Sequence, residues 1–286
     1  MTGPELEVPS IPQIVISLIL LGFLISGTIV LVMGRRYYRN RPLHHPEVDH
    51  PLRMRPWQGR DILLIILFYI AIHALLPALL SPAGFMDDDP QPLRPGVLWL
   101  NIALQIAGLA FILWLAASRH GGWRTAFGAQ SEQALPPLRL AAIIYLALWP
   151  VQAIATPLYH GLLRLLDVTI DLQEPLYMLM ESDSAAVIAG LLFLALVLAP
   201  VVEELFFRGI LLPVFRRRLG IWPAIIISSL IFALIHFHIP SFAGLFIVSV
   251  ACCLAAIWGR SVAPAIWLHA VFNAINTLLV LTWPAP

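Results

Sequence analysis

The composition of this 286-residue chain excludes an ordinary soluble globule, because 60% of its residues are hydrophobic and only 12% are charged. So little polar surface favours an exterior that faces lipid. A formal net charge of +1 gives no overall attraction to nucleic acid, and Cys252 and Cys253 are adjacent in an apolar run, which suits neither an ordinary disulfide nor spaced zinc ligands.

Apolar stretches long enough to cross about 30 Å of hydrocarbon, which takes about 20 helical residues, recur along the chain. They lie at 11–33, 62–80, 96–117, 138–158, 186–215, 222–239, 241–259 and 262–283. The sequence therefore predicts an all-α, polytopic membrane bundle of about eight transmembrane helices, with no separate soluble domain. Residues 1–184 are expected to supply the first four helices and residues 185–283 the last four.

The first stretch follows the acidic segment MTGPELEVPS, which has neither a basic leader nor a small-residue cleavage site. We therefore expect a retained anchor with an external N-terminus. All 17 basic residues are arginines, and most fall in alternate loops. Because positive residues favour the cytoplasmic side, both termini are expected to be external, in a multi-pass protein of a plasma membrane. The absence of lysine and the Ala, Leu and Pro bias are typical of a GC-rich, bacterial source.

The loop at 35–60, RRYYRNRPLHHPEVDHPLRMRPWQGR, is basic, aromatic and interrupted by prolines. We expect it to lie along the cytoplasmic membrane surface, attracted to anionic headgroups. Its histidines, His44, His45 and His50, lack the helical spacing that would favour a metal site.

The stretch VVEELFFRG at 201–209 places ionisable groups inside an apolar span. Measured from the triple arginine at 216–218, Glu203 lies roughly 20 Å along the helix. Placing one ionisable side chain at membrane depth costs about 2.5 to 3.5 kcal/mol of insertion free energy. These groups should therefore face the interior of the bundle. Pro200, just before them, is expected to kink the helix and free backbone groups toward a cavity.

Helical spacing assigns different roles to the two adjacent carboxylates. Glu204 and Arg208 are four residues apart and share a helix face, which predicts an ion pair that braces the helix. Glu203 is rotated about 100° from Glu204 and has no such partner in its own helix. We therefore expect Glu203 to be a general base that activates water.

Polar groups of two later spans reach a similar depth. His236 lies roughly 21 Å along the sixth span, and His269 and Asn273 lie roughly 12 and 18 Å along the eighth. Phe232 and His236 are four residues apart, as are His269 and Asn273, so each pair can face one cavity. The imidazoles are expected to hold water, donate to a leaving group or bind zinc. Asn273 suits an oxyanion, so the set favours water attack on an amide.

The segments EELFFR, FALIH and HAVFN resemble the three signatures of the CPBP intramembrane proteases, which read EExxxR, FxxxH and HxxxN. This family includes the CAAX prenyl endopeptidases and bacteriocin-processing proteins, and the resemblance covers about 185–283. It implies that the catalytic residues are Glu203, His236, His269 and Asn273, with Glu204 and Arg208 supporting them.

Two mechanisms remain open within this resemblance, because the family is described both as metalloproteases and as glutamate-type proteases. A zinc ion would be held by Glu203, His236 and His269. The sequence has no HExxH motif and asparagine is a poor zinc ligand, which favours a metal-independent mechanism.

Three functions are consistent with the sequence. The first is an intramembrane endopeptidase acting on a membrane-associated or hydrophobic protein or peptide, such as a bacteriocin leader, a signalling peptide or a C-terminal membrane anchor. The second is a non-catalytic adaptor or bacteriocin self-immunity protein of the same fold. The third, a transporter whose buried carboxylates carry ions, is least favoured, because nothing indicates inverted repeats.

Overall fold

The computed structural model describes residues 11–39, 55–80, 95–128 and 135–282. Within these ranges the regular structure is helical and there are no strands, which confirms the predicted all-α membrane bundle. The greater part of the basic loop at 35–60, including His44, His45 and His50, lies outside the described residues.

The long helices follow the predicted apolar stretches closely. They are α1 Ile11–Arg39, α2 Gly59–Leu80, α3 Pro95–Arg119, α5 Pro137–Leu165, a continuous helical segment over 185–219, α10 Ile221–Leu234, α11 Phe242–Trp258 and α12 Ala263–Thr282. Two short helices, α4 Trp123–Phe127 and α6 Glu174–Glu181, were not predicted.

Length and composition distinguish two groups among these helices. Helices long and apolar enough to cross a membrane are found at Gly96–Arg119, Pro137–Leu165, Ala185–Leu219 and Ala263–Thr282. Shorter apolar helices lie at Ser17–Met33, Ile221–Leu234 and Phe242–Trp258. The chain is thus a multi-pass membrane protein, while the number of eight crossings and the external termini stay predictions.

The predicted sixth span, 222–239, is too long at its C-terminal end. Helix α10 stops at Leu234, and residues 235–241 form turns before α11 begins at Phe242. Within these turns Phe237 has a positive φ of 49°, which a helix cannot contain. The proline at position 240 also disfavours a helical conformation at the preceding residue, so His236 belongs to a turn and not to the helix.

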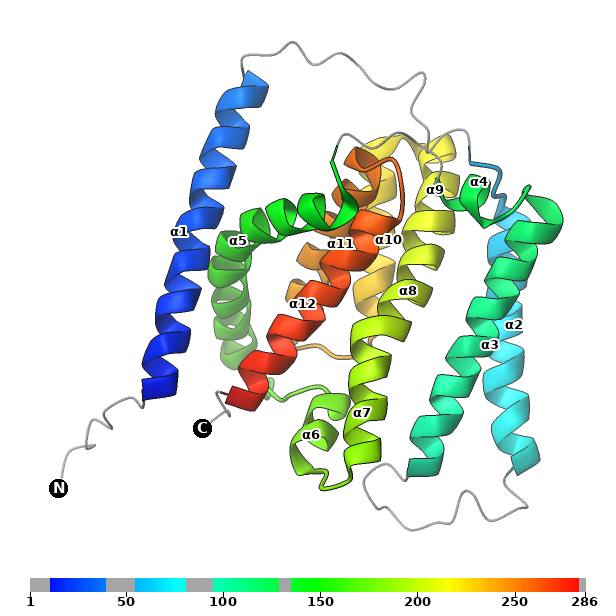
Figure 1. The fold of residues 1–286 in the computed structure, drawn as a ribbon, viewed down its shortest axis with the longest axis horizontal. Coiled ribbons are helices and arrows are strands. Elements are labelled where there is room, and N and C mark those ends of the chain that lie inside the picture. The colour runs from blue at the N-terminus through cyan, green and yellow to red at the C-terminus, as the bar shows by residue number, and fades with distance from the viewer. Residues whose placement is uncertain (1–10, 40–54, 81–94, 129–134, 283–286) are drawn as a thin grey trace.

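Helix α5 connects the two sides of the bundle. It packs against α1 on one side and against α11 and α12 on the other, whereas α2 pairs with α3 (Figure 1). Gly27 of α1 lies directly against the backbone carbonyl of Leu146 in α5, a close approach that only a residue without a side chain permits. Figure 1 also shows that α5 is bent, and Pro150 and Pro157 lie inside it.

Candidate active site

The segment at 185–219 is helical throughout but is not a regular α-helix. Helix α7 (Ala185–Phe193) is followed by the π-helical turn η2 (Leu194–Leu198), then by α8 (Ala199–Glu204), a second π-helical turn η3 (Leu205–Leu211) and α9 (Leu212–Leu219). The two acidic residues therefore lie between two π-helical turns. Such turns are rare and occur often at functional sites.

Pro200 frees a carbonyl group in the first π-helical turn. The N–H of Ala199 donates to the carbonyl of Leu194, five residues earlier. The next donor in this pattern would be residue 200, but proline has no N–H, so the carbonyl of Ala195 is available to another donor. Asn273 of α12 donates its Nδ2 to this carbonyl at 2.8 Å. The backbone group that the proline releases thus fixes α12 to this helix.

The second π-helical turn repeats the arrangement. The N–H of Leu212 donates to the carbonyl of Phe207, and the next residue, Pro213, again has no N–H to offer. The carbonyl of Arg208 instead accepts a hydrogen bond from Nη1 of Arg55 at 3.3 Å. Arg55 comes from the segment before α2, so the beginning of that helix is tied to the acidic segment.

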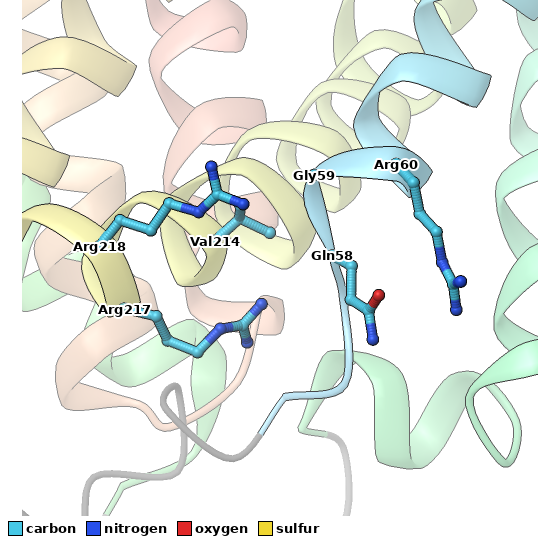
Figure 2. Close-up of a pocket in the computed structure, with 6 residues that line it drawn as sticks. All are labelled: Gln58, Gly59, Arg60, Val214, Arg217 and Arg218. Atoms are coloured by element: carbon cyan, nitrogen blue, oxygen red, sulfur yellow. The ribbon is translucent and has the colours of Figure 1, made fainter.

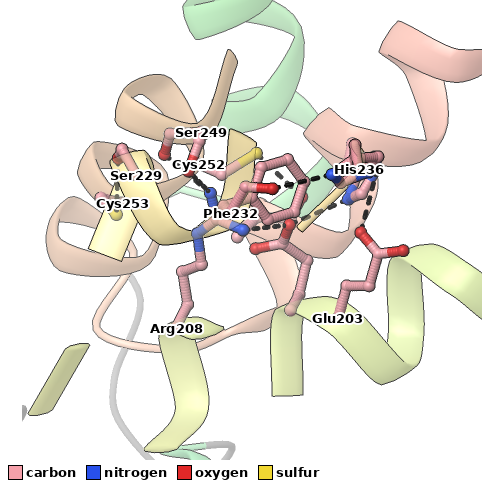
Figure 3. Close-up of polar contacts among 11 residues, drawn as sticks. Glu203, Arg208, Ser229, Phe232, His236, Ser249, Cys252 and Cys253 are labelled. Atoms are coloured by element: carbon pink, nitrogen blue, oxygen red, sulfur yellow. Dashed lines mark hydrogen bonds and ion pairs between the residues drawn. The ribbon is translucent and has the colours of Figure 1, made fainter. Parts of the chain in front are cut away.

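The ion pair expected from the sequence is present. Nη1 of Arg208 lies 2.6 Å from Oε1 of Glu204, and both side chains have an exposed fraction of 0%. Nη2 of Arg208 also donates to the backbone oxygen and to Oγ of Ser249 in α11, at 2.8 and 2.7 Å (Figure 3). The guanidinium is therefore held by two helices and neutralises Glu204 in the interior of the bundle.

Glu204 has a second partner that spacing within its helix did not reveal. Nδ1 of His269 donates to Oε1 of Glu204 at 2.9 Å. This hydrogen bond leaves Nε2 as the free nitrogen of His269, and Nε2 lies 4.0 Å from Oε2 of Glu203. Glu204 thus orients His269 toward the neighbouring carboxylate, in addition to bracing its own helix.

Glu203 differs from Glu204 in its surroundings. Its side chain has an exposed fraction of 23%, and its Oε2 atom is buried without a hydrogen-bond partner. No basic residue of its own helix is paired with it, as the helical spacing predicts. Glu203 is therefore the carboxylate that remains available to a bound molecule.

Phe232 connects the second histidine to this group. Its ring centroid lies 4.8 Å from the imidazole of His236 and 5.7 Å from that of His269, and the guanidinium carbon of Arg208 lies 4.9 Å from the same ring. His236 is held by a hydrogen bond from Nδ1 to the carbonyl of Phe232 at 2.7 Å (Figure 3). Both imidazoles therefore pack on one buried aromatic ring, each with its Nδ1 engaged.

The turn that carries His236 is fastened by α5. The hydroxyl of Tyr159 donates to the carbonyl of Ile239 at 2.8 Å, and Nε2 of His160 donates to the carbonyl of Pro240 at 3.1 Å. These contacts were not predicted, because Tyr159 and His160 stand just beyond the predicted fourth span and no motif marks them.

Tyr69 of α2 is a further polar group near the acids. Its hydroxyl is buried without a hydrogen-bond partner, and it packs against Gly108 of α3, where a side chain would collide with the phenol ring. Tyr69 packs against the apolar cluster that includes Leu205, two residues from Glu203. A single tyrosine in an apolar span gives no sequence signal of this position.

The residues of the predicted zinc site do not form a group of ligands. Among the described residues no three His, Cys, Asp or Glu side chains come together in a way that could hold a metal ion. Glu203 and His269 approach each other to 4.0 Å, and His236 shares with His269 a contact to the ring of Phe232. The arrangement of side chains therefore does not fit a zinc ion held by Glu203, His236 and His269, and we derive no step through a metal.

Comparison with known proteins identifies a match to a family. Residues 185–275 match the family described as type II CAAX prenyl endopeptidase Rce1-like. No curated protein and no solved structure gives a significant match. The matched region contains all of the polar groups that the sequence predicts as catalytic, namely Glu203, His236, His269 and Asn273.

Proposed function

Residues 185–275 place this chain in the CPBP/CAAX protease family, and from that premise we propose that it is an intramembrane endopeptidase. Its substrate is a membrane-associated or hydrophobic protein or peptide, and the reaction is hydrolysis of one peptide bond by water. We place the protein in a bacterial plasma membrane, as its arginine distribution and composition favour.

The distance between Oε2 of Glu203 and Nε2 of His269 carries this proposal. At 4.0 Å the two atoms are too far apart for a direct hydrogen bond. Two hydrogen bonds of about 2.8 Å that meet at one water molecule span roughly 4 to 5 Å, which matches this separation. The pair is therefore suited to holding a water molecule between a base and an imidazole.

In the proposed reaction Glu203 takes a proton from this water while the water oxygen attacks the carbonyl carbon of the substrate. Glu203 then returns the proton to the departing amide nitrogen, so that the carboxylate is regenerated at the end of the cycle. The hydrogen bond from His269 to Glu204 fixes the orientation of the imidazole that positions the water. Arg208 neutralises Glu204, which reduces repulsion between the two adjacent acids.

The negative charge that develops on the substrate oxygen requires hydrogen-bond donors. We assign this role to the second N–H of the Asn273 amide, since the first binds Ala195. The Nδ1–H of a neutral His236 donates to the Phe232 carbonyl, so its Nε2 is an acceptor, and we assign it to accepting a hydrogen bond from water or substrate. A neutral donor such as the Asn273 amide stabilises an oxyanion that forms in a site shielded from water.

A comparison of strains tests the proposal. A deletion strain is complemented with the wild-type protein, with Glu203→Gln, or with Glu181→Gln, a matched change of an exposed glutamate at the end of α6. Membrane and secreted proteins are then analysed for uncut precursors. We expect the same precursors to accumulate in the deletion strain and with Glu203→Gln, and to be absent with the wild-type protein and Glu181→Gln.

The same experiment distinguishes the protease from a non-catalytic adaptor. If the stably expressed Glu203→Gln protein restores every property of the wild-type strain, water activation by this carboxylate is wrong. If no precursor accumulates in the deletion strain, the protein does not act as the only protease for an abundant substrate, and the adaptor function is favoured.

A further inference from the structure

A cavity of about 580 Å³ lies at the other end of the same helical segment, away from the acidic residues. It is lined by Gln58, Gly59, Arg60, Val214, Arg217 and Arg218 (Figure 2). The lining comes from two distant parts of the chain, the beginning of α2 and the end of α9. Half of these residues are arginines and none is acidic, so the cavity has a strong positive charge.

The acidic residue nearest to the cavity in sequence does not offset this charge. Asp61, in the first turn of α2, is completely buried and its oxygens lie 3.4 Å from Nη1 of Arg119 and 3.3 Å from Nε2 of His120. It also accepts a hydrogen bond from the backbone N–H of Gln58 at 2.8 Å. The carboxylate of Asp61 is therefore paired with side chains at the end of α3 and with a backbone N–H just before α2, and it does not compensate the arginines of the cavity.

The three arginines of the cavity have different roles. Arg217 donates to the backbone carbonyls of Arg55, at 2.5 Å, and of Trp57, and so fastens the segment before α2. Arg60 and Arg218 are exposed, and Nη2 of Arg218 lies 3.7 Å from the position that a Cβ of residue 59 would take. Gly59 thus leaves room beside the guanidinium of Arg218.

The surroundings of the cavity favour one kind of ligand. The span Ala185–Leu219 ends beside it, and the neighbouring side chains of Leu219 and Trp222 are apolar and exposed, 48% and 66% respectively. Arginines next to exposed apolar and tryptophan side chains are typical of the boundary between headgroups and acyl chains. The N-terminal end of α2 adds the partial positive charge of a helix terminus.

From this combination we infer that the cavity binds the phosphate of an anionic phospholipid headgroup. Arg60 and Arg218 contact the phosphate, Gly59 provides the space, and Arg217 maintains the wall of the cavity. The acyl chains of the bound lipid lie along the exposed apolar side chains next to Trp222. This site is local and structured, whereas the attraction to headgroups expected from the sequence was spread over the whole basic loop at 35–60.

Lipid binding by the purified full-length protein tests this inference. The protein is stripped of lipid in neutral detergent, and the binding of phosphatidylglycerol, phosphatidylcholine and inorganic phosphate is measured by native mass spectrometry. The test variants are the double change Arg60→Gln with Arg218→Gln, and Gly59→Leu, which fills the cavity without changing its charge. The control is Arg124→Gln with Arg139→Gln, two exposed arginines outside the cavity.

We expect the wild-type protein and the control to bind phosphatidylglycerol more tightly than phosphatidylcholine. Loss of two arginines at a headgroup should weaken the binding of phosphatidylglycerol about 30-fold, and Gly59→Leu should weaken it although the charge is unchanged. Equal affinity for the two lipids, or equal losses in the double variant and the control, would overturn the site. Displacement of the lipid by low concentrations of inorganic phosphate would overturn the assignment to a lipid. None of these outcomes depends on proteolytic activity.

Discussion

The buried pair of Glu204 and Arg208 gives the most quantitative prediction for this fold. Glu204→Gln keeps the size of the side chain but leaves the guanidinium of Arg208, which has an exposed fraction of 0%, without its carboxylate at 2.6 Å. Breaking a buried ion pair by removing one partner costs about 3 to 5 kcal/mol. For a chain of this size 1 kcal/mol corresponds to about 2 to 4 °C in melting temperature, so we expect a decrease of roughly 6 °C or more.

A double-mutant cycle measures this interaction. Thermal unfolding in detergent is followed by tryptophan fluorescence for Glu204→Gln, for Arg208→Met and for the two together. Because the double variant contains no unpaired charge, its loss of stability should be smaller than the sum of the two single losses. Glu203→Gln is the neighbouring control, and it should change stability by less than about 1 kcal/mol because its carboxylate has no ion-pair partner in its helix. Additive losses, or an equal loss for Glu203→Gln, would refute the reasoning.

Three further predictions follow from other contacts. Asn273→Ala leaves the Ala195 carbonyl unpaired and should lower the free energy of unfolding by about 1 to 3 kcal/mol. The loss should be smaller in a Pro200→Ala background, where residue 200 regains an N–H. Equal losses in both backgrounds, measured by thermal unfolding, would contradict the proposed role of the proline. Tyr69→Phe should leave the melting temperature unchanged or raise it, because the hydroxyl is buried without a partner. If the phenol assists the acids, the same change should slow substrate processing at least about tenfold. Unchanged processing would show that Tyr69 is not part of the site. A metal chelator should leave substrate processing unchanged. If the chelator inhibits processing and added zinc restores it, the carboxylate acts only together with a metal.

The sequence predicted the helical segments and the buried ion pair because both depend on local patterns. Apolar stretches gave the helical segments, and the four-residue spacing of Glu204 and Arg208 gave the ion pair. The hydrogen bond from His269 to Glu204 could not be predicted in the same way. It depends on how α12 is rotated relative to α8, and that rotation is affected by π-helical turns that the spacing of residues within the segment did not reveal.

The remaining omissions concern contacts between distant segments. His236 was expected on a helix, but it lies in a turn whose shape depends on Phe237 and on hydrogen bonds from Tyr159 and His160 of α5. The spacing of residues within one segment carries no information about such partners. The direct roles of the predicted catalytic residues stay predictions until the variants above are measured.

The two prolines that follow π-helical turns have a consequence for the order in which the protein is assembled. An isolated 185–219 helix in lipid would contain two carbonyl groups without donors, at Ala195 and Arg208, and such groups are costly in hydrocarbon. Asn273 and Arg55 satisfy them only after other parts of the chain have associated with this helix. The newly inserted segment is therefore destabilised on its own and gains stability at the moment when its neighbours arrive. Completion of the acidic centre is in this way coupled to completion of the bundle, so the two carboxylates and their partners come together only in the assembled protein.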